Sequence, residues 1–185
     1  MQKTETVARK LLGKVLVRVQ SDTVLAGRIV EVEAYLGPDD PASHAFRGLS
    51  KRNASMFLQG GTCYVYLSYG VHYCVNVATG RQGVGEAVLL RALEPLAGEG
   101  QMRRNRKLRD KNHFGISNGP GKLTQAFSID LRFDGKRFDR EDFKLVDLGE
   151  SLGDKQVAQS PRIGISKAKE RLLRFYDKTS PWVSR

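Results

Sequence analysis

Two glutamates and a tyrosine occupy alternate positions early in the chain, at Glu31, Glu33 and Tyr35. The alternation of 28-RIVEVEAYL-36 predicts a β-strand, because successive side chains of a strand point to opposite faces. The three polar side chains then share one face. Two interpretations fit that face: an edge strand that displays carboxylates to solvent, or a pocket with aromatic walls around one carboxylate. In the pocket, burial would raise the pKa of the carboxyl group and suit it to general-base catalysis.

Two further polar residues extend this candidate site. His44 follows the strand in the turn-rich segment 37–55, where its imidazole could form part of the same pocket. Arg91 interrupts the apolar run 86–95. A buried guanidinium needs an anion, and a carboxylate on a neighbouring strand is its natural partner.

The segments 62–67 and 71–78 predict a β-hairpin whose turn carries Tyr69. Gly70 follows it and permits a sharp turn. Two interpretations fit Tyr69. The ring either folds back onto the core, or it is a wedge inserted between base pairs, as in proteins that kink DNA through the minor groove.

Each strand of this hairpin presents polar groups on one face. Tyr64 and Tyr66 share a face of the first strand, and His72, Cys74 and Asn76 share a face of the second. The amide of Asn76 could read a base edge, or it could satisfy a neighbouring backbone group.

The charge of the chain favours a polyanionic partner. Its 31 Lys and Arg against 20 Asp and Glu give a net charge of +11. The segment 102–113 is the densest basic run and predicts either a DNA-backbone contact through Arg103, Arg104 and Arg106 or a solvated helix face. The segment 119-GPGKLTQ-125 resembles a phosphate-binding helix start but lacks the spacing of a Walker motif.

Composition excludes several classes of protein. Cys63 and Cys74 are too few for a disulfide scaffold and form no CxxC pair, so we expect two reduced core cysteines. With only three histidines we expect no structural zinc site. No apolar run approaches the ~18 residues of a membrane span, and no signal region begins the chain. We expect a cytoplasmic protein, nucleoid-associated in a bacterium and nuclear in a eukaryote.

The remaining patterns predict a single α+β domain over residues 1–185, built round antiparallel hairpins. Outside the hairpin, the expected elements are a helix over 4–12, strands over 14–20, 28–36 and 86–95 (the last ended by Pro95), and a loop that feeds a helix over 118–129.

Many segments together resemble the alkyladenine (3-methyladenine) DNA glycosylase family, in its compact form without the N-terminal extension of mammalian members. The matching stretches run in family order from residue 8 to residue 184: ARKLLGKVLVR, GRIVEVEAYLGPDDPASHAFRG, KRNASMFLQGGTCYVYLSYGVHYCVN, AVLLRALEPLAG, NGPGKLTQA, RIGI, RFY and SPWVS. The segments 102–117 and 130–160 match loosely. The expected fold is a curved antiparallel β-sheet with surrounding helices and a protruding β-hairpin.

The resemblance implies a monofunctional enzyme that starts base excision repair. Such enzymes flip alkylated or deaminated purines out of duplex DNA and hydrolyse the N-glycosidic bond with an activated water. By residue-wise match, Glu33 would deprotonate the water, and Arg91 and the backbone carbonyl of Ile163 would help to hold it. Lys122 matches a family lysine near the bound DNA. Family members need no metal, so the resemblance implies neither a metal nor a cofactor. We expect a monomer acting on double-stranded DNA with damaged purines.

The resemblance also implies roles around the flipped base. Tyr35, His44 and Tyr66 would stack on it and hydrogen-bond it. Tyr69 would fill the gap left in the DNA. Asn76 would crowd the position of the 2-amino group of guanine and so reject the normal base.

Three other functions fit parts of the sequence. A bifunctional glycosylase/lyase would attack the sugar with a lysine. A non-catalytic binder of damaged or bent DNA would need Tyr69 and the basic surface but not Glu33. A metal nuclease would use Asp39 and Asp40.

Overall fold

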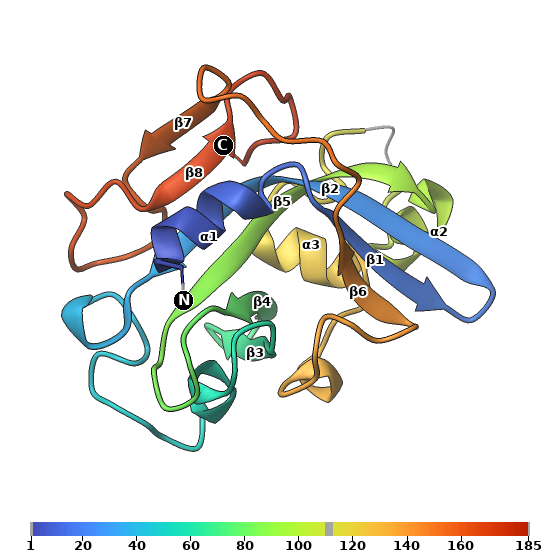
Figure 1. The fold of residues 1–185 in the computed structure, drawn as a ribbon. Helices are drawn as coiled ribbons and strands as arrows, with labels where there is room; N and C mark the ends of the chain where they lie inside the picture. The colour runs from blue at the N-terminus through green and yellow to red at the C-terminus, as the bar shows by residue number, and fades with distance from the viewer. Residues whose placement is uncertain (1, 110–112, 185) are drawn as a thin grey trace.

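A computed structural model describes residues 2–109 and 113–184 (Figure 1). In this part of the chain eight strands form one curved antiparallel sheet in the order β3-β4-β5-β2-β1-β6, with β8 paired to β2 and β7 to β8. The strands are β1 (Val15–Gln20), β2 (Thr23–Tyr35), β3 (Cys63–Ser68), β4 (His72–Ala78), β5 (Ala87–Ala97), β6 (Phe143–Val146), β7 (Val157–Ser160) and β8 (Arg174–Asp177). The helices are α1 (Thr4–Leu11), α2 (Glu99–Asn105) and α3 (Pro120–Ala126), with 3₁₀ turns at Gly37–Asp39, Ala54–Phe57 and Leu131–Phe133. The predicted α+β class and curved antiparallel sheet are confirmed.

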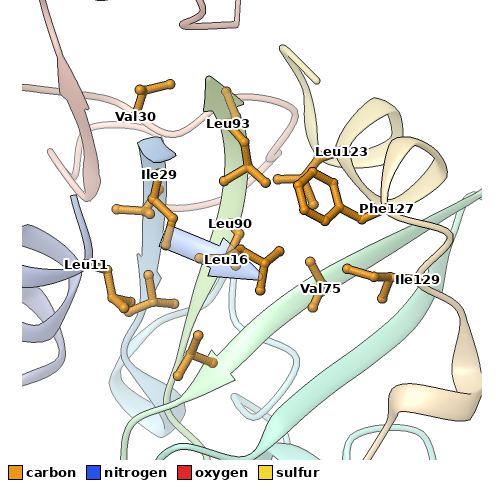
Figure 2. Close-up of a cluster of buried hydrophobic side chains, with 14 of the residues drawn as sticks. Leu11, Leu16, Ile29, Val30, Val75, Leu90, Leu93, Leu123, Phe127 and Ile129 are labelled. Carbon is orange, nitrogen blue, oxygen red and sulfur yellow. The ribbon is translucent and has the colours of Figure 1, made fainter. Parts of the chain in front are cut away.

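The core joins two helices to the sheet. Figure 2 shows Leu11 of α1 and Phe127, just after α3, in one cluster with side chains of β1, β2, β4 and β5. The alternation of the strands supplies these apolar side chains, and each fully buried one contributes roughly 1.5–3 kcal/mol of transfer free energy. Cys63 and Cys74 are both free and buried, as the sequence predicts.

Strand β2 lies inside the sheet, not at its edge. It pairs with β5 along one side, and with β1 and then β8 along the other. Glu31 and Glu33 are both 0% exposed. The interpretation that an edge strand displays these carboxylates to solvent is therefore wrong. The β2–β5 register shifts on both sides of Glu31, a bulge of the kind that re-aims side chains near functional sites.

Two strand boundaries also differ from the predicted ones. Strand β2 begins at Thr23 rather than at residue 28, so the β1–β2 turn is shorter than predicted. Pro95 does not end β5, which continues to Ala97. The ladder tolerates the missing N–H of Pro95 because the β2–β5 register is irregular where this residue faces Gly27.

Long segments outside regular strands cover one end of the sheet. The chain between β2 and β3, light blue to teal in Figure 1, and the chain between β7 and β8 lie on the same side of the molecule. Arg162 of the second segment binds Asp40 of the first, which fixes the two segments to each other. Among the described residues, no helix combines the length and the apolar character that a membrane crossing requires.

Candidate active site

A pocket of about 860 Å³ opens between β2, the β3–β4 hairpin and the loop 163–167. It brings together eight residues that the sequence predicted for the site: Glu33, Tyr35, His44, Tyr66, Tyr69, Asn76, Arg91 and Ile163. These residues come from four strands, one hairpin turn and two loops, so the site exists only in the folded sheet.

Glu33 stands at the base of the pocket with no exposed surface. Its Oε1 accepts the backbone N–H of Ile163 at 2.7 Å and lies 3.2 Å from Nη1 of Arg91. Its Oε2 accepts the hydroxyl of Tyr35 at 3.0 Å. Burial raises the pKa of Glu33, and Arg91, Ile163 and Tyr35 oppose that rise. A carboxylate has about four lone-pair sites, so the free one lies on Oε2.

Arg91 joins Glu33 to a second buried carboxylate. Its Nε donates to Glu31 at 3.1 Å, and its Nη2 donates to the hydroxyl of Ser184 at 3.3 Å. Burial disfavours the charge of Arg91, but Glu33 and Glu31 outweigh burial and raise its pKa. The predicted carboxylate partner of this buried guanidinium is confirmed.

Glu31 is fully occupied by structural contacts. Besides Arg91, it accepts Nε of Arg174 at 2.6 Å, and the N–H and hydroxyl of Ser184 at 2.6 and 2.8 Å. Glu31 has no exposed surface and does not line the pocket, so it is not placed to activate water there.

Tyr64, a residue without a predicted role at the site, supports the aromatic wall of the pocket through His44. The ring of His44 packs edge-on against Tyr66, with centroids 4.5 Å apart. His44 Nδ1 lies 2.8 Å from the hydroxyl of Tyr64. Partial burial and the charge of Arg52 lower the pKa of His44, which favours a neutral imidazole. Burial raises the pKa values of the Tyr64 and Tyr66 hydroxyls, so both stay protonated.

Asn76 satisfies a neighbouring backbone group, as one of its two interpretations predicts, and it also lies at the pocket. Its side chain lines the pocket, and its Nδ2 donates to the backbone carbonyl of Tyr64 at 3.0 Å. The cross-strand bond fixes the amide, which is only 3% exposed, against the pocket wall.

Tyr69 projects from the hairpin tip and is 87% exposed, so the interpretation that it folds onto the core is wrong. Tyr69 and Gly70 have φ of +50° and +70°, and Val71 N–H bonds the carbonyl of Ser68. This is a type I′ turn. A left-handed conformation costs a non-glycine residue on the order of 1 kcal/mol, so the tip keeps an exposed aromatic ring at a conformational cost.

Comparison with known proteins shows the family of this chain. The model of the methylpurine-DNA glycosylase family matches residues 1–181. The chain belongs to this family. The predicted resemblance is thereby confirmed, and the enzyme class is that of the DNA glycosylases.

Relatives with this family's activity in their names are similar over almost the whole chain. A "Putative 3-methyladenine DNA glycosylase" of Francisella tularensis is 46% identical over 99% of this chain and 94% of its own length. A protein of the same name from Methanoculleus marisnigri is 46% identical over 98% of this chain and 94% of its own length. The DNA-3-methyladenine glycosylase of Mus musculus is 47% identical over 99% of this chain, which spans 59% of the mouse protein.

The predicted basic residues lie elsewhere in this glycosylase-family fold. Arg103 and Arg104 bond Glu99 and Gln101 on α2, and Arg106 bonds Gln125. None of the three arginines lines the pocket. Figure 1 places α2 at the right of the molecule, away from the loop after β2 at the left. Residues 110–112 of the basic run lie outside the described residues.

Lys122 is nearer to the site. It is exposed on α3 and bonds Asn118 at 2.9 Å, and Pro120 of the same helix lines the pocket.

The aspartates proposed for a nuclease are arranged differently. The side chain of Asp40 is completely buried and accepts Nη1 and Nη2 of Arg162, the latter at 2.7 Å, as well as the N–H groups of Leu36 and Ala42. These bonds occupy its oxygens, which argues against a nuclease centred on Asp40. Within residues 2–109 and 113–184 there is no group of three or more His, Cys, Asp or Glu that could hold a metal ion.

Sequence reasoning missed the partners that hold the family's site residues in place: Tyr64, Arg162, Arg174 and Ser184. Each is distant along the chain from the group it supports, by 143 residues for Arg174 and 153 for Ser184 with respect to Glu31. The only local signal was that all four fall in stretches that resemble the family, Tyr64 in 51–76 and the others in 162–165, 174–176 and 180–184.

Proposed function

We propose that the protein is a monofunctional DNA-3-methyladenine glycosylase that hydrolyses the N-glycosidic bond of alkylated or deaminated purines in duplex DNA. The observation that carries this proposal is Glu33, a buried carboxylate that lines an aromatic pocket, pairs with Arg91 and accepts hydrogen bonds from Ile163 and Tyr35. We further propose that residues 1–185 act as one catalytic domain and as a monomer, in the nucleoid of a bacterium or the nucleus of a eukaryote.

The depth of Glu33 supports base flipping. A base stacked in a duplex cannot reach a carboxylate with no exposed surface, so the nucleotide must rotate out of the helix. Tyr69, exposed beside the pocket, would enter the gap in the stack. Unstacking costs a few kcal/mol, which a wedge recovers by holding the distorted duplex open.

The proposed chemistry is a displacement by water. Oε2 of Glu33 accepts a proton from water, the water oxygen bonds to the anomeric carbon, and the bond to the purine nitrogen breaks. The electron pair of that bond leaves with the purine. The sugar acquires oxocarbenium character, which the nearby carboxylate stabilises. Arg91 holds Glu33 by an ion pair, and the N–H of Ile163 holds it by a hydrogen bond. The carbonyl of Ile163 and the guanidinium of Arg91 are the proposed anchors of the water.

The pocket walls support selection of damaged purines. Tyr35, Tyr66 and His44 provide π-faces, which attract cationic alkylated bases. Asn76, fixed by the carbonyl of Tyr64, would crowd the 2-amino group of guanine. Hypoxanthine lacks that group and would be accepted.

Attack by water is favoured over attack by lysine. Lys122 is exposed and does not line the pocket, and Lys167, which lines it, is exposed at its rim. An amine must lose its proton to attack, and lysines lower their pKa when buried.

The test is release of the damaged base from duplexes that each carry one 3-methyladenine, 7-methylguanine, hypoxanthine or ethenoadenine, with a chelator present. We expect the wild type to release base and Glu33→Gln to lose at least roughly 10²-fold in single-turnover rate, because the amide cannot accept the proton of water. Lesion binding should survive, because the shape of the pocket is kept.

Borohydride provides the control for mechanism. It traps the covalent adduct of a lysine-dependent lyase, and we expect no adduct here. A trapped adduct, or release by Glu33→Gln at the wild-type rate, would overturn the proposal.

A further inference from the structure

Ser184 lies beside Glu31 and presents all its polar groups to Glu31 and to the two arginines that bind Glu31. Its N–H and hydroxyl donate to Glu31, and its hydroxyl also accepts Nη2 of Arg91. Its backbone carbonyl accepts Nη2 of Arg174 at 3.2 Å. Ser184 is 7% exposed and does not line the pocket. It therefore touches the supports of the site and not the substrate.

We infer that Ser184 is a positioning residue for Arg91 and, through Arg91, for Glu33. The inference rests on the proposed function of Glu33. Arg91 uses all three of its nitrogens: Nε meets Glu31, Nη2 meets Ser184, and Nη1 meets Glu33. Because a guanidinium is planar, hydrogen bonds at two of its nitrogens fix the direction in which the third nitrogen points. Glu31 and Ser184 are those two anchors.

The hydroxyl of Ser184 has a function that a small apolar side chain cannot replace. One oxygen donates to Glu31 and accepts from Arg91, so it bridges a carboxylate and a guanidinium. Without it, Nη2 of Arg91 loses its partner in a place that is nearly buried, and the guanidinium is free to turn away from Glu33. Glu33 then loses part of the positive charge that opposes the effect of burial, so its pKa rises further.

The segment around Ser184 is anchored by other contacts. The side chain of Trp182 is buried, and Asp177 accepts the N–H and hydroxyl of Thr179. Arg174 remains bonded to Glu31 and to Ser160. We therefore expect substitutions at Ser184 to leave the fold in place.

The experiment compares Ser184→Thr with Ser184→Val, because threonine and valine have the same shape and differ in the hydroxyl. Ser160→Ala is the matched control: its hydroxyl accepts Arg174 Nη1 at 3.0 Å and has no bond to Arg91. The readouts are the affinity for a duplex containing one hypoxanthine, the single-turnover rate of base release and its pH profile from acid to neutral, and the melting temperature.

We expect Ser184→Val to lose about tenfold or more in rate, the scale of one hydrogen bond to a charged group, and to move the acidic limb of the profile to higher pH. Ser184→Thr should restore both quantities, and Ser160→Ala should match the wild type. DNA affinity should stay within about twofold, since one bond outside the pocket is changed.

Equal rates and equal pH profiles for the threonine and valine variants would overturn the inference, whether or not both variants have a lowered melting temperature. A rate loss without a shift of the acidic limb would reduce Ser184 to a structural contact. A wild-type enzyme that releases no base would instead contradict the proposed function, so the two failures are distinguishable.

Discussion

Glu33 is buried on folding and gains the Ile163 N–H, the Tyr35 hydroxyl and Nη1 of Arg91 as neighbours in exchange for solvent. Burial and donors act in opposite directions on its pKa, and burial is the larger effect. A base acts in its ionised form, so activity should fall as the pH drops through this raised pKa. The acidic limb of the rate profile should therefore lie above the ordinary carboxyl value of 4.5.

Removal of one hydrogen-bond donor to Glu33 should shift the acidic limb of the rate profile. Tyr35→Phe keeps the aromatic face but removes the hydroxyl that Glu33 Oε2 accepts at 3.0 Å. The ionised form of Glu33 loses stabilisation, its pKa rises, and the acidic limb should shift to higher pH. The measurement is single-turnover base release against pH, with lesion affinity as the control. An unmoved limb would mean that the acidic loss of activity belongs to another group.

Among the elements, the β3–β4 hairpin has an unfavourable residue at its tip. Tyr69 adopts φ +50°, a conformation that asparagine tolerates better. Tyr69→Asn should leave the free energy of unfolding unchanged or raise it by up to about 1 kcal/mol, while the flipped population falls. Denaturant unfolding measures the first effect, and a base analogue that brightens on unstacking measures the second. A clear loss of stability without loss of flipping would show that Tyr69 serves the fold rather than the DNA.

The ion pair of Asp40 and Arg162 connects three elements of the site. Asp40 belongs to the segment with His44, Arg162 precedes Ile163, and Arg162 also donates to the carbonyl of Ala34 in β2. Its guanidinium lies over the ring of Tyr35, 4.6 Å from the centroid. The pair therefore holds the two covering segments and the strand with Glu33 in one arrangement.

Breaking this pair should be costly. Asp40→Asn leaves a buried guanidinium without its anion and should lower the free energy of unfolding by roughly 3–5 kcal/mol. The double variant Asp40→Leu with Arg162→Met removes both charges and should recover most of that loss. Chemical denaturation of both variants checks this expectation. If the single variant is as stable as the wild type, the pair does not join the segments as the geometry indicates.

For the molecule as a whole, the net charge of +11 predicts DNA binding that weakens steeply with salt. Each neutralised phosphate contributes about −0.9 to the slope of log K against log salt on B-DNA. Lys122→Gln, near the pocket, should reduce the slope by about 0.9, whereas Arg104→Gln on α2 should leave it unchanged. A slope that responds to Arg104 and not to Lys122 would place the DNA across α2 instead.

The local patterns and the distant contacts of this molecule differ in how far sequence can predict them. Alternation predicted the strand with Glu33, and the Tyr69-Gly70 pair predicted the hairpin turn, because both depend on neighbouring residues. The position of β2 inside the sheet depends on β5 and β8, which pair with it from far along the chain. The supports of Glu31 lie 143 and 153 residues away, and no local periodicity encodes them. The gathering of the predicted residues at one pocket therefore follows from the family resemblance, but the network that holds them could not be predicted.

The order of the sheet also determines when a newly made molecule can first act. The ribosome produces Glu33 early, but its strand is flanked by β5 and then by Arg174–Asp177, and Ser184 completes the contacts of Glu31. Chains emerge at roughly 5–20 residues per second, so Ser184 follows Glu33 out of the ribosome by roughly 8–30 seconds. A nascent chain that has not yet released Ser184 thus lacks the full set of contacts that hold Glu31 and, through Arg91, Glu33.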